Sequence, residues 1–512
     1  MPGIFEKVAN GFGLATKSQY ESLKAKSSSR AFEAARLSRL VSGWISTPVH
    51  IDQDLRNDLK ILRTRARDLC INNPYGVNFV KLMRRNVFGS NGLSLQMKVR
   101  DLNGELDEMA NENIEAGFLD WGKKGNCTAD RRLSWRGIQN LCASSFVSDG
   151  EIILRKLAGF GNRHRFSLQF IDPELLDVNL NIPRMKGRNE VRMGVELDEY
   201  DAPVAYHFLQ FREVSIATSG FYPTGGDYLR VPASEILHIY PMYRVGQTRG
   251  WPLMVPVMMV QKQLAAYEEA EITAARVSAC KIGFLTTPTG DEFTGEENSD
   301  GTMNMDLEPG EIKELPEGQE FQGWDPQHPN SAFPNFVKAM KQSMATGAGI
   351  SYPTFTGDLE GVNFSSIRAG LMEDREEWKT HQTQFIEDLA EPTFAAWLET
   401  ALMVKTVRLP FSKYEKFNKP QFMGRRWPWV DPLKDAEANR VLIEQRLTSR
   451  TAVVADQGRD FEDVLEETKQ EEALAKSMGV KLPDFAGEAG KKFFGNQGAE
   501  EGKEDGDQNN KD

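Results

Sequence analysis

The residues that could carry out acid–base or metal chemistry are scattered along this chain. Carboxylates two residues apart, as at Glu196/Asp198 and Asp358/Glu360, can serve as a general acid and base. A chain with 74 Asp and Glu residues contains such pairs by chance. The six histidines share no helix face, and His238 within ILHIYP fits a hydrogen-bonded strand residue better than a metal ligand. These patterns predict no catalytic residue and no metal site.

Two glycine-containing stretches approach a phosphate-binding P-loop, which requires GxxxxGK[ST]. Gly290 and Gly295 have the right spacing, but two glutamates follow them, and GEAGKKF (487–493) has the wrong spacing and no hydroxyl. GISYP (349–353) lacks the second glycine of a nucleophile elbow. The sequence therefore predicts no cofactor. An enzyme interpretation, such as a hydrolase or nuclease, stays open without a recognised motif.

The composition indicates a folded protein of about three or four domains, made in a cytoplasm. The four cysteines, at 70, 127, 142 and 280, lie far apart, as expected for reduced thiols. The first residues lack the apolar core of a signal peptide. The most apolar run, 251–260, is half of the roughly 20 residues that a membrane span needs. We therefore expect no membrane association.

The chain is acidic, with a net charge of -12 and a pI of about 5.3. A module that grips nucleic acid needs a basic face, so this charge disfavours a monomeric DNA-binding module. The length disfavours a small adaptor protein. The charge is compatible with a conduit that DNA slides through, because a negative wall repels phosphates.

The elements that must position any functional residue define an α+β fold. Apolar residues at helical spacing predict a helix from about Asp52 and a second from about Tyr75 to Phe88, with Gly89 at its end. Strands are predicted at 92–99 and within 150–245, and helices near 105–121 and 134–148. Long helices are predicted over 252–279, 332–348 and 364–403, and shorter ones over 433–446, 449–456 and 460–477.

A polar, glycine-containing stretch, GDLEGVNFSSIRAG (357–370), precedes the last long helix. Gly357 and Gly361 permit backbone conformations that other residues resist, and Asn363 or Ser365 can cap the helix. Arg368 opposes the helix dipole in the first turn, so it should have a carboxylate partner: Asp358, Glu360 or an acid of a neighbouring subunit. An ordinary structural turn is the alternative interpretation.

Several stretches, in the same order, resemble the lambda-type family of tailed-phage portal proteins over roughly residues 30–478. The most specific is HIYPMYRVGQTRGWP (238–252), where His238, Arg244, Gln247, Arg249 and Gly250 have the family spacing. The others are LRTRARDLCINNPYGVNFVKLMRRNVFGSNGLSLQ (62–96), DWGKKGNCTADRRLSWRGIQNLCASSFVSDGEIILR (120–155), FSLQFIDPELLD (166–177), MGVELDEYDAPVAYHF (193–208), SYPTFTGDLEGVNFSSIRAGLMEDR (351–375) and 425–464.

The resemblance implies a mixed α/β wing domain, a long-helix stem, a small β-containing clip and a helical crown, assembled as a ring. The implied parts are a mobile N-terminal segment 1–50, the wing 51–250, a first stem helix 251–280, the clip 281–328, a second stem helix 329–350, the tunnel loop 351–365, a long helix and wing return 366–432, the crown 433–478 and a disordered acidic tail 479–512.

The resemblance also implies a function without catalysis: a homo-oligomeric ring, usually of twelve copies, at one capsid vertex of the virion. Double-stranded DNA is packaged and ejected through its channel without sequence specificity. Further implied partners are the terminase large subunit, the major capsid and scaffold proteins and the head–tail connector protein.

The site residues implied by the resemblance fall into three groups. Channel-loop residues are Gly357, Asp358, Leu359, Glu360, Gly361, Val362, Asn363 and Phe364, anchored by Ser365, Ser366 and Arg368. Channel-facing stem candidates are Lys338 and Lys341, whose alternative is that of ordinary solvated lysines. Inter-subunit candidates are Arg244, Gln247 and Arg249. Their two arginines either bridge to acids of the next protomer or hold strand to helix within one chain.

Overall fold

The computed structural model describes residues 47–101, 103–210, 227–279, 283–286, 320–323, 332–361, 363–427, 432–457, 459 and 461–480. Nearly all of the predicted mobile segment, most of the predicted clip and the tail from residue 481 lie outside these residues. The chain divides into one unit that ends at Asp54 and a second unit, Leu55–Asp512, to which the features below belong.

The first helices form where the sequence predicts them. They are α3 (Ile51–Asn72), α4 (Pro74–Met83), α5 (Glu108–Trp121) and α6 (Trp135–Ser148). Asn73 separates α3 from α4 and caps the latter, accepting a 3.0 Å hydrogen bond from the Tyr75 N–H. A π-turn, η3 (Arg84–Phe88), extends α4 to Gly89, whose φ of 65° explains the glycine.

Two antiparallel sheets follow. The first has the order β3-β2-β8, with β2 (Ile152–Ala158) between β3 (Phe166–Ile171) and β8 (Ile236–Ile239). The second has the order β4-β5-β6-β7, formed by β4 (Glu190–Arg192), β5 (Val195–Leu197), β6 (Pro203–Leu209) and β7 (Tyr228–Pro232). The strands predicted within 150–245 did not include β4, a three-residue strand with a charged residue at each end, or β7. Short 3₁₀ turns lie at η4 (Pro173–Leu175), η6 (Ala233–Glu235) and η8 (Phe411–Lys413).

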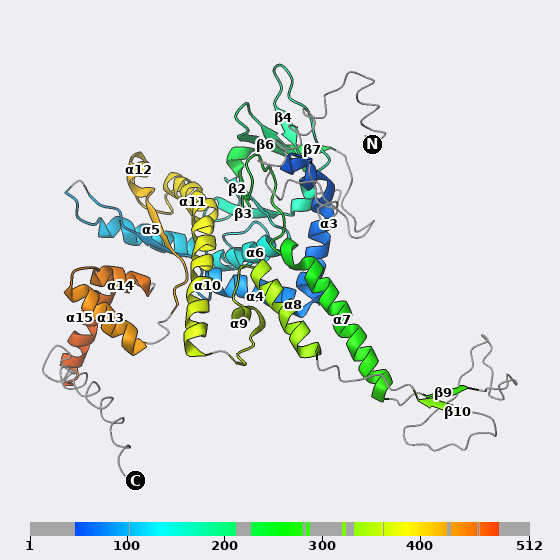
Figure 1. Ribbon diagram of the computed structural model, residues 1–512. Coiled ribbons are helices and arrows are strands. Elements are labelled where there is room, and N and C mark those ends of the chain that lie inside the picture. Colours follow the sequence, from blue (N-terminus) through cyan, green and yellow to red (C-terminus); the bar gives the residue numbers. More distant parts are fainter. Residues whose placement is uncertain are drawn as a thin grey trace, which may run out of the picture. The chain divides into compact units, whose positions relative to one another are not determined.

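Strand β1 (Ser94–Met97) pairs with β11 (Pro420–Met423), another strand that sequence analysis missed, so distant parts of the chain meet in one ribbon. Helices α7 (Val255–Ala279) and α8 (Phe333–Gly347) lie side by side, with the Tyr267 ring 5.0 Å from that of Phe336 (Figure 1). Strands β9 (Gly283–Thr286) and β10 (Glu320–Gly323) pair within the segment that joins these helices.

The helix predicted over 364–403 is interrupted. It consists of α10 (Phe364–Phe385), a π-turn η7 (Ile386–Ala390) and α11 (Glu391–Val404). Of the apolar residues predicted on one face of this helix, Trp378, Phe385 and Leu389 are buried, and Ile367 and Leu371 are half-buried. The remaining helices are α9 (Tyr352–Thr356), α12 (Tyr414–Phe417), α13 (Pro432–Glu444), α14 (Arg450–Asp456) and α15 (Phe461–Ser477).

The main hydrophobic core joins α4–α6 to α10 and α11. Phe385 lies 4.9 Å from Phe88 and 5.1 Å from Phe146, and Phe118 lies 5.1 Å from Trp397, between ring centroids. A smaller core, around Tyr206 and Phe208, lies under the four-stranded sheet. The structure is therefore an α+β fold with two connected apolar centres.

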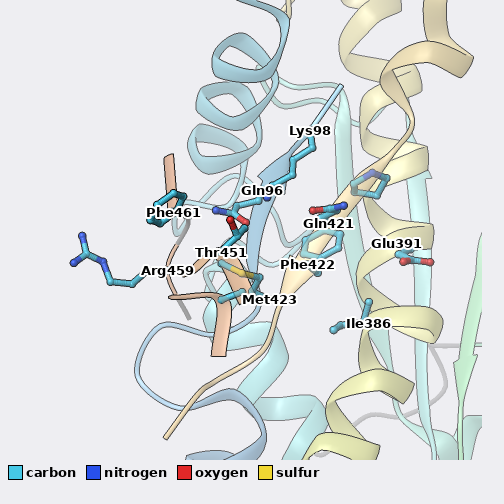
Figure 2. Close-up of a pocket in the computed structure, with 12 residues that line it drawn as sticks. Gln96, Lys98, Ile386, Glu391, Gln421, Phe422, Met423, Thr451, Arg459 and Phe461 are labelled. Carbon is cyan, nitrogen blue, oxygen red and sulfur yellow. The ribbon is translucent and has the colours of Figure 1, made fainter. Parts of the chain in front are cut away.

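A cavity of about 360 Å³ lies where α14 and α15 approach the β1–β11 ribbon (Figure 2). Phe461 and Thr451 line it beside Gln96 and Met423, and Ile386 of the π-turn lies on another side. The charged residues that line it are Lys98, Glu391 and Arg459.

Candidate functional site

The polar stretch 357–361 leaves α9 through a left-handed turn. Gly357 has φ 75° and its N–H bonds to the Pro353 carbonyl, and Gly361 has φ 68°. A Cβ added at either position would meet no atom within 4 Å, so the backbone angle and not space requires glycine. Leu359, with 63% of its surface exposed, and Glu360 project from the tip.

Asp358 holds the shape of this loop. Its carboxylate accepts a 2.9 Å bond from the Glu360 N–H and a 2.8 Å bond from the Tyr352 hydroxyl. These bonds, together with the charges of Lys338 and Lys341, lower the pKa of Asp358. The loop therefore carries a fixed anion beside the cations of α8.

Lys338 and Lys341, the predicted stem cations, lie over aromatic rings. The Lys338 ammonium is 5.9 Å from the centroid of Tyr352, and that of Lys341 is 5.5 Å from Tyr75. Lys338 is exposed and Lys341 is half-buried. Both are thus placed at the base of the loop rather than along a distant part of α8.

Asn363 is the N-cap of α10, accepting a 2.8 Å bond from the Ser366 N–H. Ser365 and Ser366 are exposed, and Val362 and the Phe364 side chain lie outside the described part of the chain. Arg368 falls in the second turn of the helix, and its partner within the chain is neither Asp358 nor Glu360. Its guanidinium pairs with Asp435 of α13 at 2.8 Å, because the packing brings α13 beside α10.

Sequence analysis missed the strongest anchor of the loop. The Asp374 carboxylate accepts 2.7 Å bonds from both the N–H and the hydroxyl of Ser351, and so joins α10 to the start of α9. A usable signal existed: Asp374 is four residues before Trp378, on the apolar face of the helix, where a carboxylate requires a buried partner.

Arg249 does not project toward another subunit. Its side chain is fully buried, and the guanidinium pairs with buried Glu151 at 2.5 Å and donates to the carbonyls of Leu176 (2.8 Å), Met193 (2.9 Å) and Pro173 (3.1 Å). Each nitrogen of the Arg249 guanidinium donates to a group of the same chain. These contacts favour the alternative in which Arg249 holds strands and loops of one chain together.

Gln247 also acts within the chain. Its amide accepts from the Tyr243 and Arg244 N–H groups and donates to the carbonyls of Pro241 and Arg249 at 3.0 Å each. These bonds favour a role for Gln247 within the chain, and its inter-subunit role stays a prediction. The side chain of Arg244 is exposed at the tip of the same loop, so a contact with a neighbouring subunit stays a prediction for this residue.

Ionisable groups with shifted pKa values cluster around Glu151, although no pattern in the sequence indicated such a cluster. Arg63 and Arg249 both pair with Glu151, and His238 Nε2 lies 3.0 Å from the same carboxylate. Burial opposes ionisation of Glu151, but the charges of Arg249 and Arg63 outweigh it and hold its pKa well below its usual range. His238, the predicted hydrogen-bonded strand residue, has a pKa lowered by burial. Because solvent does not reach these side chains, the cluster is structural.

Within the described residues, no group of three or more His, Cys, Asp or Glu side chains could hold a metal ion. In the same part of the chain, no helix is long and apolar enough to cross a membrane.

The sequence profile of lambda-family phage portal proteins matches residues 37–382. The probable portal protein of Halomonas phage phiHAP-1 is 31% identical over 494 residues, which cover 94% of each chain. Portal protein B of Escherichia phage lambda and the portal protein of Escherichia phage N15 are each 21% identical and cover 87% of this chain and 90% of their own.

Matches among solved structures include the neck of an empty gene transfer agent particle. It covers 82% of this chain and 97% of its own at 14% identity, with a TM-score of 0.41. The neck of the native particle covers 79% and 93% at 12% identity, with a TM-score of 0.40.

These matches define a structural assembly protein of tailed phages rather than an enzyme class. The chain belongs to the lambda family of phage portal proteins. The resemblance seen in the sequence is thereby confirmed, and a portal role is the function of this chain.

Proposed function

We propose that this chain closes into a homo-oligomeric ring of about twelve copies, a cyclic assembly built by one repeated heterologous interface. The ring occupies one vertex of the capsid in the virion, after synthesis in the host cytoplasm. Double-stranded DNA passes through its centre during packaging and ejection. The ring docks the terminase large subunit, the major capsid and scaffold proteins and the head–tail connector protein, and it catalyses no reaction itself.

The observation that carries this proposal is the construction of the loop 357–361. Both of its ends are fixed, by Asp374 on Ser351 and by the Asn363 cap, while Leu359 and Glu360 face solvent. Such a short loop, stiff at its base and exposed at its tip, suits the narrowest part of a channel. Lys338 and Lys341 at its base supply limited positive charge, enough to guide phosphates without gripping them.

The ring is tested by native mass spectrometry and negative-stain imaging of the purified chain. Annular particles of about a dozen copies with a central hole support it. A compact monomer that does not assemble at high concentration contradicts it.

The position of the loop is tested by cross-linking assembled rings of the Leu359→Cys variant under mild oxidation. Loops that line a constriction bring neighbouring copies within the roughly 7 Å between Cα atoms that a disulfide allows, so a ladder of covalent oligomers is expected. Tyr200→Cys is the matched control, because Tyr200 is highly exposed at a turn of the four-stranded sheet. Rings that form but give no ladder with Leu359→Cys would remove the loop from the constriction.

A further inference from the structure

A second concave site in this acidic chain is lined by arginines. Arg85, Arg425 and Arg426 surround a cavity of about 370 Å³, together with the turn Gly89–Gly92 and Gln457. In the part of the chain that the structure describes, no carboxylate lines it. In a chain with 74 acidic residues and a net charge of -12, three cations around one cavity without an acid are unexpected.

Arg425 is held in place by neutral groups. Its guanidinium donates to the Arg85 carbonyl and, at 3.1 Å, to Asn86 Oδ1. Its side chain crosses Gly89, where an added Cβ would lie 2.8 Å from Arg425 Cδ at a φ of +65°. Glycine at position 89 therefore permits the close approach that orients this arginine.

The cavity arginines have no counter-ion among the described side chains. Within the described residues, neither Arg85, Arg425 nor Arg426 forms an ion pair, and Arg426 Nε is buried without a hydrogen-bond partner. Burial and the like charges of Arg85 and Arg375 lower the pKa of Arg425. Buried donors and adjacent like charges are costly unless an anion compensates them.

The site adjoins the loop assigned to the channel. Arg85 also lines a neighbouring cavity, whose walls include Gly357, Leu359 and Trp427. The Arg425 and Arg375 guanidiniums each lie 5.9 Å from the centroid of the Trp427 ring, which limits their freedom. The arginine cavity therefore lies next to a second cavity that reaches the loop.

We propose that the cavity formed by Arg85, Arg425 and Arg426 binds a phosphate group of the DNA backbone. Guanidinium forks bind phosphate oxygens in pairs, and the concave wall presents several donors to one anion. The site would hold DNA weakly and without sequence specificity, because it reads only phosphate. This proposal rests on the proposed passage of DNA past the neighbouring loop.

The test measures binding of a fluorescein-labelled DNA duplex to the assembled full-length protein by anisotropy, over a series of salt concentrations. The variants are Arg85→Gln, Arg426→Gln and their combination. Arg425 is left intact because it also supports the Arg85 backbone. Arg188→Gln is the control for the single variants. Arg188 is exposed in the hairpin before β4, and its replacement also removes one positive charge.

We expect the double variant to bind the duplex roughly tenfold more weakly, as the loss of a charge-assisted contact requires. The slope of log affinity against log salt should become shallower by about 1, because both arginines contact the same phosphate group. Arg188→Gln should match the wild type. Arg85→Lys combined with Arg426→Lys should restore part of the affinity, because charge returns without the fork.

An unchanged affinity and salt slope in the double variant, with folding verified by thermal unfolding, would overturn the proposal. A second arm titrates inorganic phosphate: arginine-dependent binding of phosphate alone, with DNA binding unaffected, would identify a free-anion site instead and also overturn it. Native mass spectrometry of every sample separates this outcome from failure of the ring. Rings that form but bind DNA without these arginines contradict only the site.

Discussion

Ser351 and Asp374 are joined by two hydrogen bonds of 2.7 Å, one from the backbone N–H and one from the hydroxyl of Ser351 to the two carboxylate oxygens. Asp374 is buried in the middle of α10, whereas Ser351 precedes α9. The pair therefore fixes the chain before the loop 357–361 to the helix that follows it. The loop keeps its exposed tip because its base is attached to the main core.

Replacing Asp374 with Asn should loosen this base. The variant retains the size of the side chain but loses its charge, and one Ser351 donor will face an amide that cannot accept it equally well. We expect a loss of roughly 1–2 kcal/mol in unfolding free energy. Faster amide hydrogen exchange over 351–361 should accompany it. Glu373→Gln, at an exposed neighbouring position, should change neither quantity; protection of the loop equal to wild type in Asp374→Asn would disprove the anchoring role.

Replacing Arg249 with Met should destabilise the monomer rather than the ring. The change leaves Glu151 buried with fewer compensating charges, and loss of one partner of a buried ion pair costs about 3–5 kcal/mol. Urea unfolding of the monomer measures this. Arg244→Met, at an exposed site in the same loop, should have little effect on folding. A variant of Arg249 that unfolds like the wild type yet does not assemble would restore the inter-subunit interpretation.

The Arg368–Asp435 pair should contribute little to stability, because the two side chains are 35% and 21% exposed. A double-mutant cycle with Arg368→Ala and Asp435→Ala should give a coupling energy of about 0.5–1 kcal/mol, reduced by salt. Its effect should instead appear in DNA packaging, if α13 must stay beside α10. Normal assembly and packaging by the Arg368→Ala variant would show that this arginine does not anchor the loop.

His381 should make the fold sensitive to mild acid. Burial beside Phe146 and Trp378 lowers its pKa from 6.5 to about 4, although Glu377 Oε1 lies 3.5 Å from its Nε2. Between pH 6.5 and 4 the His381 imidazole binds a proton in the unfolded chain but not in the folded chain. Stability should therefore be complete above pH 6.5 and fall as the pH drops toward 4, by up to about 3 kcal/mol from this residue.

His381→Phe removes this titration. The unfolding free energy of the variant minus that of the wild type should therefore rise as the pH falls from 6.5 to 4. Chemical denaturation across this range measures the difference. A constant difference would contradict the assignment. Glu151 adds a separate loss at lower pH, since its pKa is held below its usual range and its ionised form stabilises the fold.

The sequence by itself determined the features that depend on neighbouring residues. Helical spacing and the expected cap at Asn363 placed the helices, apolar alternation placed β2, β3 and β6, and glycines marked the loop after α9. The order of motifs identified the family, because motif order survives where overall identity is low. Local backbone preferences and periodic burial act over a few residues, so they can be followed along the chain.

Only the tertiary structure decided which distant residues meet. It paired β11 with β1, gave Arg368 a partner on α13, and buried Arg249 against Glu151 instead of leaving it on the surface. It also brought Arg85 beside Arg425 and Arg426, which no spacing in the sequence connects. A charged side chain carries no local sign of its partner, because the partner is set by which faces of the helices and sheets pack together.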